Sequence, residues 1–322
     1  MSTDAETLAD RRRLRRKLSF WRVLGVLALI AAVAAIGFTV EGRTGWRAGP
    51  QIARVSIGGF ISGDQRMSDL LRRVGESASV SGVVISINSP GGSVTGAEEL
   101  FQNIRALAAK KPTVAFVDGT AASGGYLAAI GTDHIVARQT SLVGSIGVLL
   151  QYPDVSSLLG KLGVAVEEVK STPLKAAPNP FRPTSPEARA VLQEVVDDTH
   201  QWFRAIVAER RNLTPEQVDG VATGRVFNGR QSVALRLVDG VGDERTAIGW
   251  LERERGVTRD LPVRNWRPRG GRDFDLLTAA GFGLDLLGFD RIAESLHRAS
   301  RAADIAKLDG LLAIWHPALE NQ

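Results

Sequence analysis

The amino-acid sequence predicts an α/β domain over residues 51–257. From residue 51 onward, apolar runs of strand length alternate with segments whose apolar residues recur at helical spacing, and this order is typical of α/β proteins. Several runs are apolar at every position, as expected for strands covered on both faces. The composition agrees, because 44% of the 322 residues are hydrophobic and can form a compact core.

The first four elements alternate regularly. We expect strands at 52–57 and 83–87 and helices at 65–79 and 96–110, because the former are short apolar runs and the latter keep one apolar face. Pro112 ends the second helical pattern, since proline removes a backbone donor and clashes with the preceding turn. These elements predict the first half of a sheet with helices packed on it.

The next strand and helix meet at a serine. Residues 114–117 predict a buried strand, and residues 121–129, rich in Ala, Gly and Leu, predict a helix. Ser123 therefore lies near a helix N-terminus, where free backbone N–H groups favour negative charge. Further strands are predicted at 134–137, 146–150 and 164–169.

Proline positions organise the following part of the chain. Four prolines predict that residues 171–185 lack regular structure. Two pairs, each a hydroxyl-bearing cap followed by proline, predict helix starts. They are Ser185-Pro186, whose helix should reach about Arg211, and Thr214-Pro215. Residues 235–241 predict an edge element and a turn.

The amino-terminal region predicts a membrane anchor. Residues 1–22 are basic, and residues 23–40 form an uncharged run that would span roughly 27 Å as a helix, close to the thickness of a bilayer's hydrocarbon core. The basic flank predicts a cytoplasmic amino-terminus and a domain across the membrane, joined by a linker at 41–50. A cleaved signal peptide is the alternative, because Ala32-Val33-Ala34 has the form that signal peptidase accepts.

Charge and composition exclude several function classes. Four of the five net positive charges lie in the amino-terminal arm, so no nucleic-acid partner is expected for the domain. The chain has no cysteine, which excludes thiolate metal sites and cysteine nucleophiles, and we expect no cofactor. In the tail at 258–322, the apolar segments 274–289 and 308–315 are expected to contact a neighbouring subunit or the membrane, or else to pack internally.

Two glycine-rich loops follow predicted strands. Ser89-Pro90-Gly91-Gly92 comes directly after 83–87, and Pro90 should end strand pairing while the glycines expose main-chain N–H groups that could stabilise an oxyanion; a tight structural turn is the alternative. Residues 118–126 form the second loop. Because both follow strands of one sheet, we expect them to converge at the same edge.

A nucleophilic serine needs a base. Ser123 could equally be a helix cap, and the Gly-x-Ser-x-Gly elbow is absent because position 121 is Ala. His134 is expected as a cap or core residue and His200 on a solvated helix face. A lysine can act instead when it is neutral, although most lysines are simply exposed. The lysines at suitable positions are Lys161, Lys170 and Lys175.

Together these motifs resemble the signal peptide peptidase A family in its short, single-domain form, over roughly residues 51–255. The segments that carry the resemblance are Ser89 to Gly92, Asp118 to Tyr126, Val143 to Val148, Gly224 to Phe227 and Leu237 to Asp239. The resemblance implies a ClpP/crotonase-like fold with repeated β-β-α units.

The resemblance also implies residue roles. Ser123 would be the nucleophile, Lys175 the general base and Ser145 the hydroxyl that orients the lysine, with Lys170 as the alternative base. The oxyanion hole would consist of Gly124 and either Gly91 or Gly92.

The implied function is a membrane-anchored serine endopeptidase with a Ser-Lys dyad. Its substrates would be remnant signal peptides, and it would assemble into homo-oligomeric rings whose active sites are shared between neighbours. The catalytic domain would lie on the extracytoplasmic side of a bacterial inner membrane. Two alternatives are an acyl-CoA enzyme of the crotonase type, which would need no nucleophile, and a non-catalytic membrane scaffold.

Overall fold

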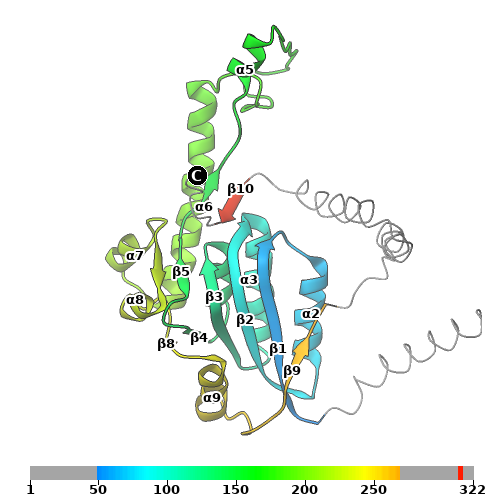
Figure 1. The fold of residues 1–322 in the computed structure, drawn as a ribbon, viewed down its shortest axis with the longest axis vertical. Helices are drawn as coiled ribbons and strands as arrows, with labels where there is room; N and C mark the ends of the chain where they lie inside the picture. The colour runs from blue at the N-terminus through cyan, green and yellow to red at the C-terminus, as the bar shows by residue number, and fades with distance from the viewer. Residues whose placement is uncertain (1–48, 269–310, 315–322) are drawn as a thin grey trace, which may run out of the picture. The chain divides into compact units, whose positions relative to one another are not determined.

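A computed structural model describes residues 49–268 and the backbone of residues 311–314 (Figure 1). The predicted arm at 1–22, the anchor at 23–40 and the apolar segment at 274–289 lie outside the described residues. Within the described part, no helix has both the length and the apolar character needed to cross a bilayer.

The described strands form one mixed, ten-stranded sheet, so the predicted α/β class is confirmed. Its central order is β6-β10-β2-β3-β4-β8, while β1 pairs with β2 and β9, and β5 pairs with β3 and β7. The strands are β1 (Gln51–Ile61), β2 (Val80–Ser93), β3 (Thr113–Ala122), β4 (His134–Ala137), β5 (Leu142–Gly144), β6 (Leu149–Leu150), β7 (Val226–Asn228), β8 (Gly240–Val241), β9 (Val263–Trp266) and β10 (Leu311–Ile314). The pairs β5–β7, β10–β2 and β10–β6 are antiparallel and the others parallel.

Helices cover both faces of the sheet. The helices are α2 (Gln65–Glu76), α3 (Val94–Ala108), α4 (Gly124–Ile130), α5 (Ser156–Lys161), α6 (Pro186–Arg211), α7 (Pro215–Val221), α8 (Gly229–Ala234) and α9 (Glu244–Glu254). Along β2, Val83 and Ile85 point into the core beneath α2, α3 and α4, while Val84 points to the opposite face, where α9 packs. Both faces are therefore buried, as the wholly apolar strands predict.

One long strand precedes each of α2, α3 and α4, so this part of the chain lacks the β-β-α units that the family resemblance implies. The prediction that Pro90 ends strand pairing is also wrong, since β2 continues to Ser93. The register between β1 and β2 shifts between Gly58 and Phe60, so Pro90 lies at a bulge, where its missing N–H costs no ladder hydrogen bond.

Two other boundaries differ from the predictions. Ala121 and Ala122 belong to β3 rather than to the following helix, which begins at Gly124. The strand predicted at 164–169 is absent, and Val169 is fully exposed. This valine-rich segment, which also contains Glu167 and Glu168, pairs with no strand of the described part and lies outside the core. The strand predicted at 146–150 is reduced to β6.

The helix-start predictions are confirmed. Ser185 accepts a hydrogen bond from the N–H of Ala188 and caps α6, and Thr214 forms a capping box with Gln217 at the start of α7. Figure 1 shows that α6 extends past the sheet and that the segment between β6 and α6, including α5, lies at its far end. Residues 171–185 contain no helix or strand, as predicted.

Candidate active site

Ser123 occupies a strained turn between β3 and α4. Its backbone angles are φ 53° and ψ −117°, a conformation that costs a non-glycine residue about 1–3 kcal/mol unless its surroundings enforce it. Its N–H donates a 2.7 Å hydrogen bond to the carbonyl of Gly144. The side chain is 1% exposed. Enforced strain at a strand-to-helix turn also occurs at the nucleophile elbow of α/β-hydrolases, although the sequence motif of that elbow is absent here.

The Ser123 hydroxyl does not cap the helix. Ser123 stands at the N-cap position of α4, yet its side chain makes no capping hydrogen bond. It donates instead to the carbonyl of Gly147 at 3.4 Å, a long and weak hydrogen bond. The first N–H groups of a helix have no intrahelical acceptor, and Gly124 is the first residue of α4. Its N–H is therefore a free helical donor next to the Ser123 hydroxyl, which itself makes only the long hydrogen bond to Gly147. The geometry thus favours the chemical role of Ser123 over the capping role.

The first glycine loop packs directly against α4. Ser89 pairs with Ala121 across β2 and β3, and a Cβ added at Gly125 would lie 2.6 Å from the carbonyl oxygen of Ser89. The Ser89 hydroxyl donates to the carbonyl of Gly59 at 2.7 Å and accepts from the N–H of Gly91 at 3.1 Å. The two glycine loops therefore converge at one edge of the sheet, as their positions after neighbouring strands predict.

Gly92 serves close packing. A Cβ at this position would lie 1.8 Å from the carbonyl oxygen of Ile61, so only glycine lets β1 approach β2 here. The structure thus places Gly91, Gly92 and Gly124 around the same edge, where the N–H of Gly91 donates to the Ser89 hydroxyl. Their role as oxyanion donors stays a prediction.

Tyr126 anchors α4 by a buried hydrogen bond to the chain near Leu237. Its side chain is wholly buried, and its hydroxyl donates a 2.8 Å hydrogen bond to the carbonyl of Leu237. Burial raises the pKa of the phenol, so Tyr126 remains a neutral donor. This contact ties the helix that follows Ser123 to a distant part of the chain.

Ser145 lies next to Ser123 across the pair of strands β3 and β5. Ala122 pairs with Gly144 between β3 and β5, and Ser145 follows directly, with φ 49° and its N–H bound to the carbonyl of Arg225 at 2.7 Å. Ser123 and Ser145, which both have positive φ, therefore lie next to each other at the ends of the paired strands β3 and β5. Ser145 is 7% exposed, so it belongs to the buried wall of the site.

Lys175 is not in this cluster. It lies in the segment between β6 and α6, where its side chain is exposed and its N–H bonds to the carbonyl of Thr172 at 3.1 Å. Within the described residues, no hydrogen bond joins it to Ser123 or Ser145. The structure therefore brings together the predicted nucleophile, orienting serine and oxyanion donors of one chain, and places the predicted base elsewhere.

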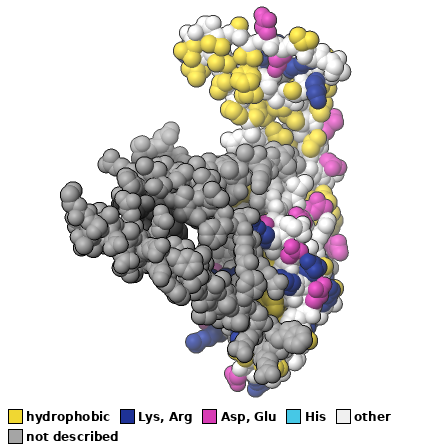
Figure 2. Space-filling view, turned by 90° about the vertical axis from the view of Figure 1, so that its right-hand side faces the viewer, with side chains coloured by type: hydrophobic (Ala, Val, Ile, Leu, Met, Phe, Trp, Pro, Cys, Tyr) yellow, Lys and Arg dark blue, Asp and Glu magenta, His cyan; other side chains and the backbone are white. Residues whose placement is uncertain are grey.

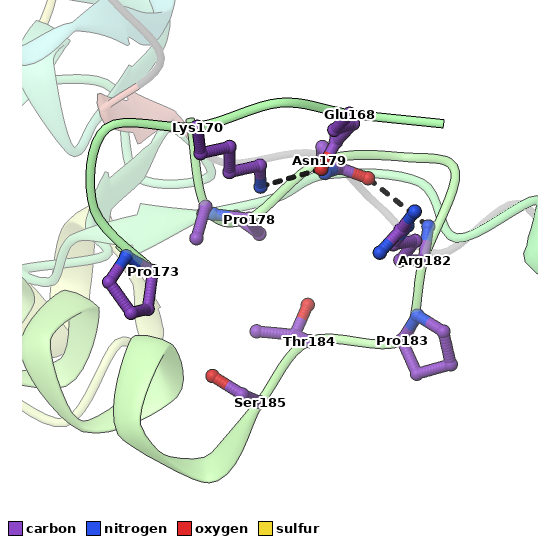
Figure 3. A pocket seen from close by; sticks show the side chains of 10 residues that line it. Glu168, Lys170, Pro173, Pro178, Asn179, Arg182, Pro183, Thr184 and Ser185 are labelled. Atoms are coloured by element: carbon purple, nitrogen blue, oxygen red, sulfur yellow. Dashed lines mark hydrogen bonds and ion pairs between the residues drawn. The ribbon is translucent and has the colours of Figure 1, made fainter. Parts of the chain in front are cut away.

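The segment that carries Lys175 is held by Glu168 (Figure 3). One carboxylate oxygen forms an ion pair with Lys170 at 2.7 Å, and the other accepts a 2.6 Å hydrogen bond from the amide of Asn179. These side chains line a cavity of about 320 Å³ together with Arg182, which donates to the carbonyl of Val166 at 3.0 Å. Glu168 thus joins the two ends of the loop whose middle holds Lys175. It also engages the ammonium group of Lys170 in an ion pair.

Neither histidine is placed as a base for Ser123. His134 pairs with Val114 at the start of β3, whereas Ser123 follows its end, roughly 30 Å away at about 3.3 Å per residue. It stacks on Trp250 at 4.5 Å and lies 3.5 Å from a carboxylate oxygen of Asp239. Burial lowers the pKa of His134. His200 is half-buried rather than solvated, and its Nε2 makes no hydrogen bond in the described part.

Sequence reasoning missed two contacts at the site. The carbonyl of Gly147 receives the Ser123 hydroxyl, and the carbonyl of Ser89 requires glycine at position 125. The second had a visible signal, because two adjacent glycines after a serine often permit a close backbone approach. The contact from the Ser123 hydroxyl to Gly147 depends on the pairing of β5 with β3, which no local sequence pattern indicates. Across residues 49–268, no cluster of three or more His, Asp or Glu side chains is arranged to hold a metal ion.

Two family models match the chain. The model described as Peptidase family S49 matches residues 105–258, and the model described as Clp protease matches residues 65–141. The first range contains Ser123, Ser145 and Lys175.

Individual proteins agree with these matches. A candidate protease of Methanocaldococcus jannaschii is 35% identical over 216 residues, which are 67% of this chain and 70% of that protein. A candidate protease of Synechocystis sp. is 36% identical over 212 residues, or 65% of this chain and 76% of that protein. A candidate signal peptide peptidase, SppA, of Enterococcus faecium is 36% identical over 191 residues, or 58% of this chain and 55% of that protein.

Proposed function

Because the chain belongs to peptidase family S49 and is a serine peptidase, we propose that Ser123 is its nucleophile and Lys175 its general base. The observation that carries the proposal is the turn at Ser123. There a buried hydroxyl, free of any capping role, lies beside the first N–H of α4 and against the loop that begins at Ser89. Membership of a serine peptidase family counts against the two alternatives, the acyl-CoA enzyme and the non-catalytic scaffold.

The chemistry follows from these groups. Neutral Lys175 takes the hydroxyl proton as Ser123 attacks the carbonyl carbon of the scissile bond. The N–H of Gly124 and that of Gly92, or that of Gly91 once it releases the Ser89 hydroxyl, stabilise the oxyanion that forms. Collapse of this intermediate breaks the C–N bond, and Lys175 returns the proton to the leaving amine. Water then hydrolyses the acyl-enzyme in the same way, while the Ser145 hydroxyl orients the lysine.

The dyad would form between two copies of the chain. The segment that carries Lys175 and the first half of α6 expose many large apolar side chains, and Figure 2 shows hydrophobic side chains gathered at this end of the molecule. Such a surface is typical of a subunit interface. The exposed residues are Leu158, Leu162, Val164, Val169, Leu174, Phe181, Val191 and Val195. A ring in which this surface docks on a neighbour would supply Lys175 to the neighbour's Ser123.

The substrates would be remnant signal peptides. The uncharged run at 23–40 would anchor the enzyme in a bacterial inner membrane, with the catalytic domain on the extracytoplasmic side. A relative named as a signal peptide peptidase supports this substrate class. An enzyme held at the membrane meets peptides that remain in the bilayer.

The test is hydrolysis of a synthetic signal peptide by the purified full chain in detergent, with Ser123→Ala beside it. The proposal expects cleavage by the parent and none above background by the variant. Full activity of Ser123→Ala would show that the nucleophile is another residue.

A further inference from the structure

Lys175 lies in the middle of a loop with two arms, residues 166–182, which we call the lysine loop. Its first arm, residues 166–170, alternates between half-buried and exposed positions, and Glu168 and Lys170 are half-buried. An extended chain with one covered side alternates in this way. Both side chains therefore lie on the covered side of the arm.

Side-chain contacts close the neck of the lysine loop. Glu168 accepts a 2.6 Å hydrogen bond from the amide of Asn179 on the second arm, and Arg182 donates to the carbonyl of Val166 at 3.0 Å. The amide oxygen of Asn179 accepts from the N–H groups of Phe181 and Arg182 at 3.0 and 3.1 Å. The amide that meets Glu168 is therefore itself fixed to the second arm, and Figure 3 shows Glu168 and Asn179 meeting between the two arms.

The other carboxylate oxygen of Glu168 engages Lys170. The ion pair measures 2.7 Å, and the two side chains are 20% and 23% exposed. Charge-assisted hydrogen bonds of this length are stronger than neutral ones, and partial burial reduces their screening by salt. Glu168 therefore keeps one of the two lysines of the lysine loop bound at the neck.

Lys175 lies at the far end of the lysine loop from this neck. Its N–H bonds to the carbonyl of Thr172, and the N–H of Ala177 bonds to the carbonyl of Leu174, each at 3.1 Å. Its side chain is exposed, and no side chain of the described residues forms an ion pair or hydrogen bond with its amine. The position of that amine therefore depends on the backbone of a short loop, whose arms are held together at the neck.

We propose that Glu168 is the positioning residue of the general base: by closing the neck and binding Lys170, it holds Lys175 where its amine takes up the nucleophile's proton. This inference rests on the proposed function, in which Lys175 is the base. Without the carboxylate, the neck loses its hydrogen bond to Asn179 and the tip of the loop can move. Since a misplacement of reacting groups by about 1 Å costs about 10²-fold in rate, kcat should fall. Substrate binding uses the glycine loops around Ser123 and should be retained.

The first experiment measures kcat and KM of Glu168→Ala on a synthetic signal peptide. We expect kcat to fall about 10²-fold while KM stays within about twofold of the parent's value. Glu167→Ala is the matched control, because Glu167 carries the same charge on the same arm but is exposed, and it should behave as the parent. Equal kcat values for the two alanine variants, or a loss that lies in KM alone, would overturn the proposal.

A conservative variant separates positioning from mere presence of a side chain. The amide oxygen of Glu168→Gln can still accept the hydrogen bond from Asn179, so this variant should recover most of the kcat that Glu168→Ala loses. The melting temperature and the oligomeric mass of Glu168→Ala should equal those of Glu167→Ala. A Glu168→Gln variant as slow as Glu168→Ala would contradict the role of the neck.

The third experiment uses mixtures of Ser123→Ala with Lys175→Ala that regain activity by subunit exchange. The first variant supplies the lysine and the second supplies the serine. Glu168→Ala added to the lysine donor should lower the activity of the mixture about 10²-fold, whereas the same change in the serine donor should leave it unchanged, because only the first alters the loop of the working amine. Equal losses in the two mixtures would mean that Glu168 only stabilises the chain.

The two proposals fail in different ways. If Lys175→Ala still cleaves the signal peptide, the proposed base is wrong and Glu168 has no base to position. If Lys175→Ala is inactive while Glu168→Ala and Glu167→Ala have the same kcat, the base stands and the positioning role of Glu168 does not exist.

Discussion

The backbone N–H of Ser123 donates a 2.7 Å hydrogen bond to the carbonyl oxygen of Gly144. This contact connects the strained turn at the end of β3 to β5 and brings Ser145 beside Ser123 in space, although the two serines are 22 positions apart in sequence. It also directs the Ser123 hydroxyl toward the carbonyl of Gly147 and away from the capping position of α4.

Lys175→Ala should abolish turnover. Without the amine, nothing removes the Ser123 proton, and we expect kcat to fall about 10³-fold or more. Lys170→Ala should reduce kcat far less, because the ammonium group of Lys170 is already ion-paired with Glu168. A larger loss of kcat from Lys170→Ala than from Lys175→Ala would contradict Lys175 as the base.

Mixing two inactive variants should restore activity if the dyad spans two copies. Ser123→Ala and Lys175→Ala are combined in equal amounts, and subunits are allowed to exchange in detergent. Random assembly leaves about a quarter of the sites with an intact serine and an intact lysine from different chains, so about a quarter of the parent's activity should return. No recovery, despite exchange shown by mass spectrometry, would mean that each chain supplies both residues.

Gly125→Ala should impair catalysis more than folding. The added Cβ would meet the carbonyl of Ser89 at 2.6 Å, which pushes α4 away from the first glycine loop and separates Ser123 from the oxyanion donors. A misplacement of the reacting groups by about 1 Å costs about 10²-fold in rate, so we expect kcat/KM to fall by about that factor. Gly220→Ala in α7 is the matched control, since a Cβ there meets nothing within 4 Å. Equal kcat/KM values for the two variants would show that the close approach of Ser89 and Gly125 does not position the site.

His134 should contribute to stability in a pH-dependent way. Burial lowers its pKa below the ordinary value of 6.5, so the unfolded chain takes up the proton first as pH falls. The stability it contributes is present above about pH 6.5 and is lost as pH falls through the lower folded pKa. His134→Phe keeps an aromatic ring beside Trp250 but has no proton to gain. Urea unfolding at about pH 7 and about pH 5 should therefore show a smaller loss for the variant, and an equal loss would contradict this role.

Elements with local signals could be predicted from the sequence. α6 and α7 begin at Ser185-Pro186 and Thr214-Pro215 because cap and proline act within one turn. The run at 164–169 could not be assigned correctly, because its valines have the same strand-like composition whether or not a neighbouring strand is present to pair with them. Residues 142–144 and 226–228 pair with each other over 84 positions of sequence, and no local pattern indicates such a pair.

The candidate site was predictable to a similar degree. The glycine loops at Ser89 and Ser123 follow neighbouring strands, so their convergence follows from topology. The backbone angles of Ser123 and the separation of Lys175 from it depend on tertiary packing. β10 lies in a tail that was expected to contact a neighbour or the membrane, or else to pack internally, and its place beside Gly91 follows from pairing between distant segments.

The central claim is that Ser123 is the nucleophile, and covalent labelling tests it most directly. The purified full chain is treated with a serine-directed phosphonate and the adduct is located by mass spectrometry, with Ser145→Ala and Ser123→Ala treated in parallel. The account predicts a single adduct on Ser123 that persists in Ser145→Ala and disappears in Ser123→Ala. An adduct on another residue, in an enzyme whose Ser123→Ala variant still hydrolyses the peptide, would contradict it.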